Sequence, residues 1–295
     1  MFRIVEVTRR GAALRIRNAC LEVSVEGKAT TVSFPLDEIS VVLLSQSAVT
    51  LTGSVPMELA ARKIPMIFCD GRMLPAGVLS PCRYDSDSSY TVLEAQLAAP
   101  LPLKKRIWQK LVAAKIAGQD RNLKKWRDTK ILEPLCSKVL SGDRDNREGR
   151  AAALYWKALA LFSRRDPAAA DSNVLFNYAY TVLYAVFARE IVAAGLLPKL
   201  GVHHHHRNNP YVLASDLMEP LRPCMDDLIL QSLEEGMPPY PLLTENKREL
   251  LRKIYGCRIA GQQGERPLFS VSRDLVHSFK RALVDRSAAS FCCLA

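Results

Sequence analysis

Imidazole and carboxylate side chains are concentrated in one short segment of the chain. Residues 201–219 read GVHHHHRNNPYVLASDLME, in which the run His203–His206 precedes Asp216 and Glu219. The run holds four of the five histidines in the sequence. Neutral imidazole and carboxylate oxygen are ligands that transition and alkaline-earth cations accept, so the segment predicts a divalent metal site. An exposed polar loop is the alternative interpretation.

A further carboxylate is expected at the start of a helix. Residues 141–146, SGDRDN, form a polar turn ahead of REGRAAALYWKAL, which carries apolar residues at helical spacing. If Asp145 or Asn146 caps this helix, Glu148 falls in its first turn. There it either complements the helix dipole, an effect of roughly 0.3 to 1 kcal/mol, or serves as a metal ligand. This segment alone favours the dipole role.

The two acids after the histidines are predicted to share one helix. Asn209 and Pro210 form a cap and a first-position proline, which places Asp216 and Glu219 three residues apart on one face. Two carboxylates on one face repel each other unless a cation lies between them. A glutamate from one helix, a histidine from a loop and a carboxylate from another helix together predict a site for Mg²⁺ or Mn²⁺, with positions open to phosphate oxygens.

The charge of the chain indicates an anionic partner. A formal charge of +11 and a pI near 9.4 favour association with nucleic acid or with an acidic membrane. Residues 101–130 contain ten Lys or Arg against two Asp, and this clustering predicts a nucleic-acid contact because an ordinary solvated helix face mixes both signs. The ten are Lys104, Lys105, Arg106, Lys110, Lys115, Arg121, Lys124, Lys125, Arg127 and Lys130.

Periodicity predicts an α+β protein with a small β-rich domain followed by a larger α-helical one. Residues 1–80 carry short, alternating segments such as FRIVEV and ISVVLL, with one helical segment, SVPMELAARK. Residues 81–90, PCRYDSDSSY, are polar and predict a linker. From residue 91 to 295 the apolar residues recur at helical spacing, which predicts an all-α domain.

Neither a membrane span nor a signal peptide is expected. The most apolar window, YAYTVLYAVFAREIVAAGLL, is interrupted by Arg189 and Glu190, so it falls short of the roughly 18 uninterrupted apolar residues of a spanning helix. The opening MFRIVEVTRR alternates apolar with polar residues, unlike a signal peptide. The sequence therefore predicts a cytoplasmic protein that does not bind membranes.

Four motifs, taken in order, carry a resemblance to a known family. They are NREGRAAALYW, DSNVLFNYAYTVL, AAGLLPKLGVHHH and LASDLMEPLRP, and they follow the β-rich N-terminal module. Together they resemble the CRISPR-associated integrase, the larger protein of the universal spacer-acquisition pair. The LMEP-R ending and the overall length look most like the type II branch. The resemblance covers nearly the whole chain, through motifs from 141 to 223 and through architecture before 90.

The resemblance implies which side chains act. The positions that match the family's catalytic and metal-binding residues are Glu148, His204 and Glu219, with Asp216 as an auxiliary ligand. A shift of one residue within the histidine run would make His203 or His205 the ligand instead. The metal implied is Mg²⁺ or Mn²⁺.

The resemblance also implies a reaction. The family's activity is that of a metal-dependent DNA integrase and endonuclease, which captures short DNA duplexes and joins their 3′-hydroxyl ends to a CRISPR repeat by transesterification. A non-catalytic DNA-binding scaffold and a general metal-dependent nuclease are the alternatives. The basic residues expected at DNA are Lys104, Lys105, Arg106, Lys124, Lys125, Arg127, Arg147, Arg150 and Arg222. In the other interpretation the last three form surface ion pairs.

The partners implied by the family are double-stranded DNA, a second copy of the chain and a small ferredoxin-like adaptation protein. The second copy is expected to join through the β-rich domain, residues 1–80. Further type II CRISPR proteins complete the expected set of partners.

Overall fold

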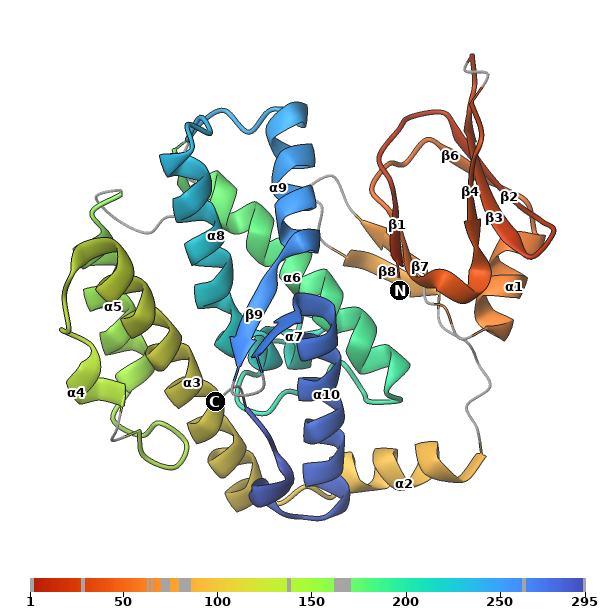
Figure 1. Ribbon diagram of the computed structural model, residues 1–295. Helices are drawn as coiled ribbons and strands as arrows, with labels where there is room; N and C mark the ends of the chain where they lie inside the picture. Colours follow the sequence, from red (N-terminus) through yellow and green to blue (C-terminus); the bar gives the residue numbers. More distant parts are fainter. Residues whose placement is uncertain are drawn as a thin grey trace. The chain divides into compact units, whose positions relative to one another are not determined.

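The computed structural model describes residues 3–27, 30–62, 64, 66–69, 75–79, 86–136, 139–161, 171–261 and 264–293. The chain divides into two compact units, Met1–Tyr90 and Thr91–Ala295 (Figure 1). Helix α2 (Ser86–Leu97) covers the second half of the segment predicted as a linker, whereas residues 81–85 of that segment lie outside the described residues. Polar composition alone did not distinguish this helix from a linker.

The first unit contains two four-stranded sheets, ordered β1-β5-β7-β8 and β4-β3-β2-β6. In the first sheet β1, β5 and β7 run parallel and β8 is antiparallel to β7. In the second, β2 and β3 form an antiparallel hairpin. The elements are β1 (Arg3–Val7), β2 (Ala12–Arg17), β3 (Cys20–Val25), β4 (Val32–Pro35), η1 (Leu36–Glu38), β5 (Ile39–Leu44), β6 (Val49–Leu51), α1 (Ser54–Ala61), β7 (Met66–Cys69) and β8 (Pro75–Leu79).

Alternation of side chains builds the core of the first unit. In β2, Ala12 and Leu14 are buried while Ala13 and Arg15, which alternate with them, are exposed, as a strand with one solvated face requires. Val55 and Leu59, one helical turn apart on α1, join the same hydrophobic cluster. The predicted β-rich module is confirmed, although the short strands β6 and β8 were not anticipated.

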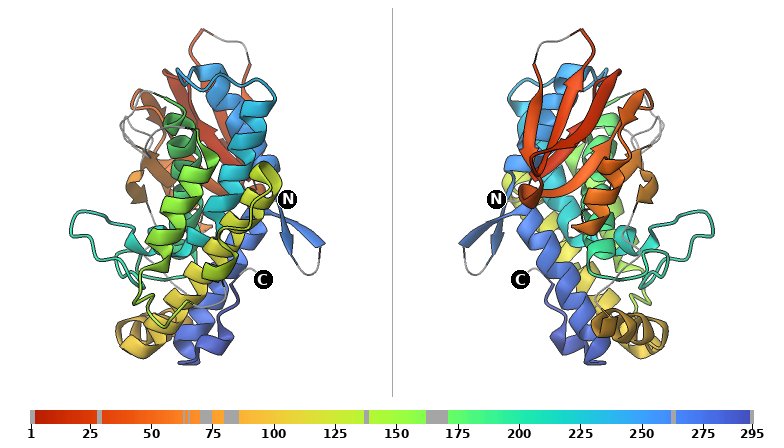
Figure 2. Two further views of the ribbon diagram at one scale, coloured as in Figure 1. Left: turned by 90° about the vertical axis from the view of Figure 1, so that its left-hand side faces the viewer. Right: turned by 90° about the vertical axis from the view of Figure 1, so that its right-hand side faces the viewer.

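The second unit is mainly helical, as predicted, so the α+β class is confirmed. Figure 2 shows one exception, the β9–β10 hairpin, which projects from the helices of this unit and was not anticipated. The remaining elements are α3 (Leu101–Arg127), α4 (Glu133–Cys136), α5 (Arg147–Leu159), α6 (Asn173–Ala193), α7 (Val212–Leu217), η2 (Glu219–Leu221), α8 (Arg222–Glu234), α9 (Thr244–Gly256), β9 (Arg258–Gly261), β10 (Gly264–Pro267), α10 (Leu268–Val284) and η3 (Ala288–Ser290).

Helix α3 organises the second unit because it packs against α4, α5, α7, α8 and η2. Its buried stripe includes Leu103, Ile107 and Leu111, which follow one another at intervals of about one helical turn. Gly118 lies where α3 meets α8, and a Cβ placed on it would stand 2.9 Å from two side-chain carbons of Pro223. The close approach of these helices therefore depends on the missing side chain.

The helix predicted to begin at Pro210 begins at Val212 and is short. The side-chain oxygen of Asn209 accepts a hydrogen bond from the backbone N–H of Tyr211, so Asn209 organises the turn ahead of the helix. The helix α7 ends at Leu217, and Glu219 starts the 3-10 turn η2. The prediction that Asp216 and Glu219 belong to one helix is wrong, because the chain changes from α7 to η2 between them.

The helix α6 contains the apolar window considered as a membrane span. Arg189 and Glu190 interrupt it with a buried ion pair, Nη1 to Oε1 at 3.3 Å. No helix within the described ranges is both long enough and apolar enough to cross a membrane.

We predict that Gly118→Ala lowers the free energy of unfolding by about 1 to 3 kcal/mol, because the added methyl group overpacks the contact between α3 and α8. Gly256→Ala is the matched control, since a Cβ there meets nothing within 4 Å and alanine favours the helix by up to about 1 kcal/mol. Urea denaturation measures both. Equal unfolding midpoints for wild type and Gly118→Ala would contradict the close helix approach.

Candidate active site

Glu148 is positioned by the capped N-terminus of α5. Asn146 is the N-cap residue, and its side-chain oxygen accepts from the N–H of Gly149 at 3.2 Å. The carboxylate of Asp143 accepts from the N–H groups of Arg147 and Glu148 at 2.9 and 3.1 Å. Three of the helix's free N–H groups are thereby satisfied, which fixes the first turn. Glu148 lies in that turn, as predicted.

The loop ahead of α5 is attached to α3. The N–H of Gly142 donates to the backbone oxygen of Lys105 at 2.9 Å, and the side-chain amide of Gln109 donates to the oxygen of Val139 at 2.6 Å. Gly142 has φ +73°, a conformation that favours glycine. These contacts fix the position of Glu148 along the axis of α3.

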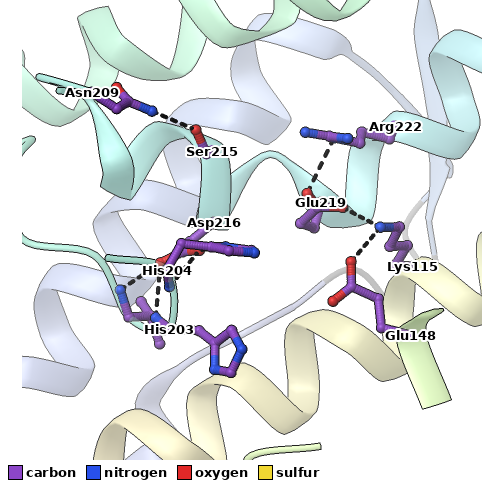
Figure 3. Close-up of polar contacts among 10 residues, drawn as sticks. Lys115, Glu148, His203, His204, Asn209, Ser215, Asp216, Glu219 and Arg222 are labelled. Carbon is purple, nitrogen blue, oxygen red and sulfur yellow. Dashed lines mark hydrogen bonds and ion pairs between the residues drawn. The ribbon is translucent and has the colours of Figure 1, made fainter. Parts of the chain in front are cut away.

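A buried lysine joins the two predicted glutamate ligands. The ammonium of Lys115, on α3, lies 2.6 Å from Oε1 of Glu148 and 2.5 Å from Oε2 of Glu219. Figure 3 shows it between the two carboxylates, which come from α5 and η2. The side chains of Lys115 and Glu219 are only 10% and 4% exposed, so this charge cluster is largely shielded from water.

The charges of the cluster stabilise one another. Burial acts to raise the pKa of Glu219, but the cations of Lys115 and Arg222 outweigh it and hold this pKa below its ordinary value. Burial acts to lower the pKa of Lys115, and the charges of Glu219 and Glu148 more than compensate, so this pKa is raised. Nε of Arg222 lies 3.2 Å from Oε1 of Glu219. Glu219, Lys115 and Arg222 are therefore ionised at neutral pH.

Asp216 anchors the histidine loop. Its carboxylate is fully buried and accepts backbone hydrogen bonds from Val202, His203 and His204 at 2.6, 2.9 and 3.4 Å. It also accepts from Nδ1 of His204 at 2.5 Å. A Cβ on Gly201 would lie 2.6 Å from the backbone oxygen of His204 and 2.7 and 2.8 Å from side-chain atoms of Val212 and Asp216 on α7, so the turn requires glycine.

These contacts give Asp216 a role other than the predicted auxiliary ligand. Two donors occupy Oδ1 and two occupy Oδ2, so the carboxylate is committed to the loop. Because Oδ1 of Asp216 accepts the hydrogen bond from Nδ1, the neutral imidazole of His204 carries its proton on Nδ1 and keeps its lone pair on Nε2. Asp216 is thus a positioning residue for the imidazole.

The geometry distinguishes the histidines of the run. The ring of His203 stacks on Trp108 with centroids 4.4 Å apart, whereas His204 meets the same indole edge-on at 5.3 Å. The hydrogen bond to Asp216 raises the pKa of His204, with smaller contributions from the charges of Glu148 and Glu219. His205 and His206 are exposed. The arrangement favours His204 over His203 as the residue that faces the two glutamates.

The structure assembles the predicted site in part. Lys115 brings Glu148 and Glu219 together, and His204 lies close enough for both to act on its pKa. Within the residues that the structure describes, no three His, Cys, Asp or Glu side chains converge closely enough to hold a metal ion. The space between the glutamates is taken by the ammonium.

Lys115 was not predicted as a site residue, although the sequence holds a signal for it. It follows Trp108 by seven residues and Leu111 by four, which places it on the buried stripe of α3. A lysine on such a stripe requires a partner, since buried cations are paired. Clustering with neighbouring basic residues had assigned it to a solvent-facing surface instead.

The predicted DNA-binding residues divide into two groups. Lys124, Lys125 and Arg127 are engaged within the chain, with Asp120, with Asp227 and with backbone oxygens respectively. Lys105 and Arg106 are exposed and Lys104 is half-buried, and within the described ranges none of the three forms an ion pair.

The three arginines near the glutamates also differ. Arg147 pairs with Asp145 at 2.5 Å, and Arg222 pairs with Glu219 and lies over the ring of Tyr180. Arg150 is exposed on α5. The alternative of ion pairs therefore describes Arg147, while Arg222 belongs to the buried cluster.

Comparison with known proteins identifies the family. The family model described as CRISPR associated protein Cas1 matches residues 5–240. A CRISPR-associated endonuclease Cas1 of Neisseria meningitidis serogroup C (strain 8013) is 32% identical over 286 residues, which are 95% of this chain and 92% of that protein. The chain belongs to the Cas1 family. The Neisseria relative also fits the type II-like resemblance.

Solved structures agree with the fold. A structure titled "Casposase bound to integration product" has a TM-score of 0.79 at 18% identity, over 97% of this chain and 92% of that chain. A Cas1 protein from Thermotoga maritima has a TM-score of 0.75 at 16% identity, over 96% of this chain and 97% of that chain. The order of a β-rich unit followed by a helical unit is thus shared with the Cas1 fold.

We predict that Asp216→Asn destabilises the protein by about 2 to 3 kcal/mol, because an amide cannot replace a carboxylate that accepts four hydrogen bonds and keeps Nδ1 of His204 protonated. Thermal unfolding measures the loss. Asp128→Asn is the matched control, since Asp128 is exposed in a left-handed conformation that asparagine also adopts. The role of Asp216 would be contradicted if both variants unfolded at the wild-type temperature.

Proposed function

We propose that this Cas1 protein is a divalent-metal-dependent DNA integrase and endonuclease. It captures short DNA duplexes and joins their 3′-hydroxyl ends to a CRISPR repeat by transesterification. The observation that supports this most is the pairing of two largely buried glutamates from distant parts of the sequence around one cation, with His204 beside them.

The donor set fits Mg²⁺ or Mn²⁺. Glu148 and Glu219 supply carboxylate oxygens, and Nε2 of His204 is free to coordinate because Nδ1 is bonded to Asp216. Oε2 of Glu219 is buried and lies 2.5 Å from the ammonium of Lys115, so a divalent cation at this oxygen would take the place of that ammonium. A cation held by these three side chains supplies a Lewis acid for phosphoryl oxygens.

The chain's own groups contribute orientation and charge. Asp216 keeps the imidazole in one tautomer, and the capped first turn of α5 fixes the direction of Glu148. Arg222 neutralises part of the charge of Glu219. These constraints limit the orientations of the three side chains before DNA arrives.

Two alternatives stay distinct from this proposal. The curated relatives are named endonucleases, which favours a metal-dependent nuclease as the second candidate. Such an enzyme cuts DNA without forming a joined product. A scaffold without catalysis neither cuts nor joins.

The proposal includes the partners that the family resemblance implies. Double-stranded DNA is expected along the α3 surface that begins at Lys104, and a second copy is expected to join through the first unit. A structural neighbour titled "Cas6-RT-Cas1--Cas2 complex" has a TM-score of 0.77 at 20% identity, over 98% of this chain and 36% of that chain. That assembly supports the proposal of a small ferredoxin-like adaptation partner. Further type II CRISPR proteins and a cytoplasmic location belong to the same proposal.

The proposal predicts that Glu148→Gln and Glu219→Gln each lower strand transfer about 100-fold or more, because each removes a charged ligand while keeping its shape. The assay uses a branched duplex that resembles the joined product and measures its reversal in Mn²⁺. Affinity for the duplex should stay within about twofold, since phosphate contacts lie elsewhere. Glu234→Gln, at an exposed position of α8, is the control. Wild-type rates in the folded Glu148→Gln variant would refute the metal-dependent reaction, and cleavage without joining would favour the nuclease.

A second prediction concerns the two basic groups on α3. Each phosphate neutralised by a lysine contributes about 0.9 to the slope of log affinity against log salt, so Lys104→Ala/Lys105→Ala should reduce that slope by about two. Lys124→Ala/Lys125→Ala should change it less, because both side chains already pair with aspartates.

Duplex binding across a salt series measures these slopes, and Lys247→Ala/Arg248→Ala on α9 removes the same charge as a control. A larger effect from Lys124 and Lys125 than from Lys104 and Lys105 would place the DNA along the opposite end of α3.

A further inference from the structure

The position of Lys115 raises a question that the proposed metal site does not answer. A divalent cation requires the same two carboxylates that this ammonium contacts. Carboxylate oxygens bind Mg²⁺ at about 2.0 to 2.1 Å, closer than the contacts to the lysine nitrogen. Both cations therefore cannot lie between Glu148 and Glu219 at once.

The two carboxylates need a cation in every state of the protein. Both oxygens touch a single nitrogen, so the acids lie close together, and the side chain of Glu219 is only 4% exposed. Adjacent buried carboxylates that lack a cation repel each other and lose their hydration. The ammonium removes this penalty while no metal is bound.

The ammonium of Lys115 can also move away from the two carboxylates. Oε2 of Glu219 lies 2.5 Å from the ammonium. Lysine carries its charge on a flexible stem with four methylene groups, so the nitrogen can move while the backbone of α3 stays in place. An arginine, with a planar fork, would bind the carboxylates more rigidly.

We propose that Lys115 is an internal counterion, which holds Glu148 and Glu219 together in the metal-free protein and competes with the divalent cation for them. This inference rests on the proposed metal site. The lysine stabilises the empty form and weakens metal binding, so the site can stay assembled without being permanently loaded.

The first test measures Mn²⁺ affinity of the full chain by electron paramagnetic resonance of the free ion. Lys115→Met keeps the length and removes the charge, and it should tighten Mn²⁺ binding at least about tenfold because no ammonium has to be displaced. Lys110→Met is the matched control on the same helix, since its ammonium bonds the backbone oxygens of Ala288 and Phe291 instead. The control should lose stability without a change in Mn²⁺ affinity.

Equal or weaker Mn²⁺ binding by folded Lys115→Met would overturn the competition, and would assign the lysine to holding the ligands only. Glu148→Gln separates this result from a failure of the proposed function. If wild type binds Mn²⁺ and Glu148→Gln binds it more weakly, the metal site stands and the Lys115→Met result decides the inference. If wild type does not bind Mn²⁺, the proposed cation and the competition fail together.

The second test needs no metal and remains decisive if Lys115→Met folds poorly. In EDTA, Lys115→Met should unfold at a lower temperature than wild type, because two carboxylates are left facing each other. Adding Glu219→Gln should raise the unfolding temperature of Lys115→Met, whereas Glu219→Gln alone should lower that of wild type. A Glu219→Gln change with the same sign in both backgrounds would show that Lys115 is not the counterion of this pair.

Discussion

The second unit depends on one requirement, which is that a lysine buried in the middle of its longest helix must be paired. Removing a charge from water costs several kcal/mol per ion unless opposite charges take the place of the solvent. Lys115 meets this requirement with Glu148 from α5 and Glu219 from η2. Because both acids bind one nitrogen, the elements that carry them cannot shift independently along α3. The same electrostatic contact therefore fixes the packing and assembles the acids of the site.

Two acids separated by three residues have opposite surroundings and hence different functions. Asp216 is fully buried against N–H groups of the histidine loop, which makes it an anchor for backbone and imidazole. Glu219 faces the cations of Lys115 and Arg222 instead. The helix α7 ends at Leu217, and Glu219 starts η2. Residue type and spacing alone assigned both to one face and to one metal.

Much of this arrangement could be predicted because it rests on local patterns. The alternating segments before residue 80, the long helices after residue 100 and the cap of α5 at Asn146 all follow from periodicity and turn chemistry. The failures have two causes. The β9–β10 hairpin pairs two four-residue strands that are adjacent in sequence, which carry too short a pattern to stand out. Helix α2 depends on a contact between distant segments, since the side chain of Gln96 bonds the backbone of Leu197. Lys115 belongs to the same class. Its pattern on α3 was visible, but its partners come from two distant elements, and only the fold brings them together.

The division of charge on α3 connects these observations. The sequence shows a single basic cluster, but the structure separates it by what lies opposite each side chain. Lys124 and Lys125 form ion pairs with Asp120 and Asp227. Lys115 forms ion pairs with the two glutamates. Lys104 and Lys105, at the start of the helix, form no ion pair within the described ranges, so their charge is available to a partner. One helix can therefore bind an anionic duplex at one end and hold acids for a cation in its middle, because burial prevents the solvent-exposed lysines from neutralising those acids.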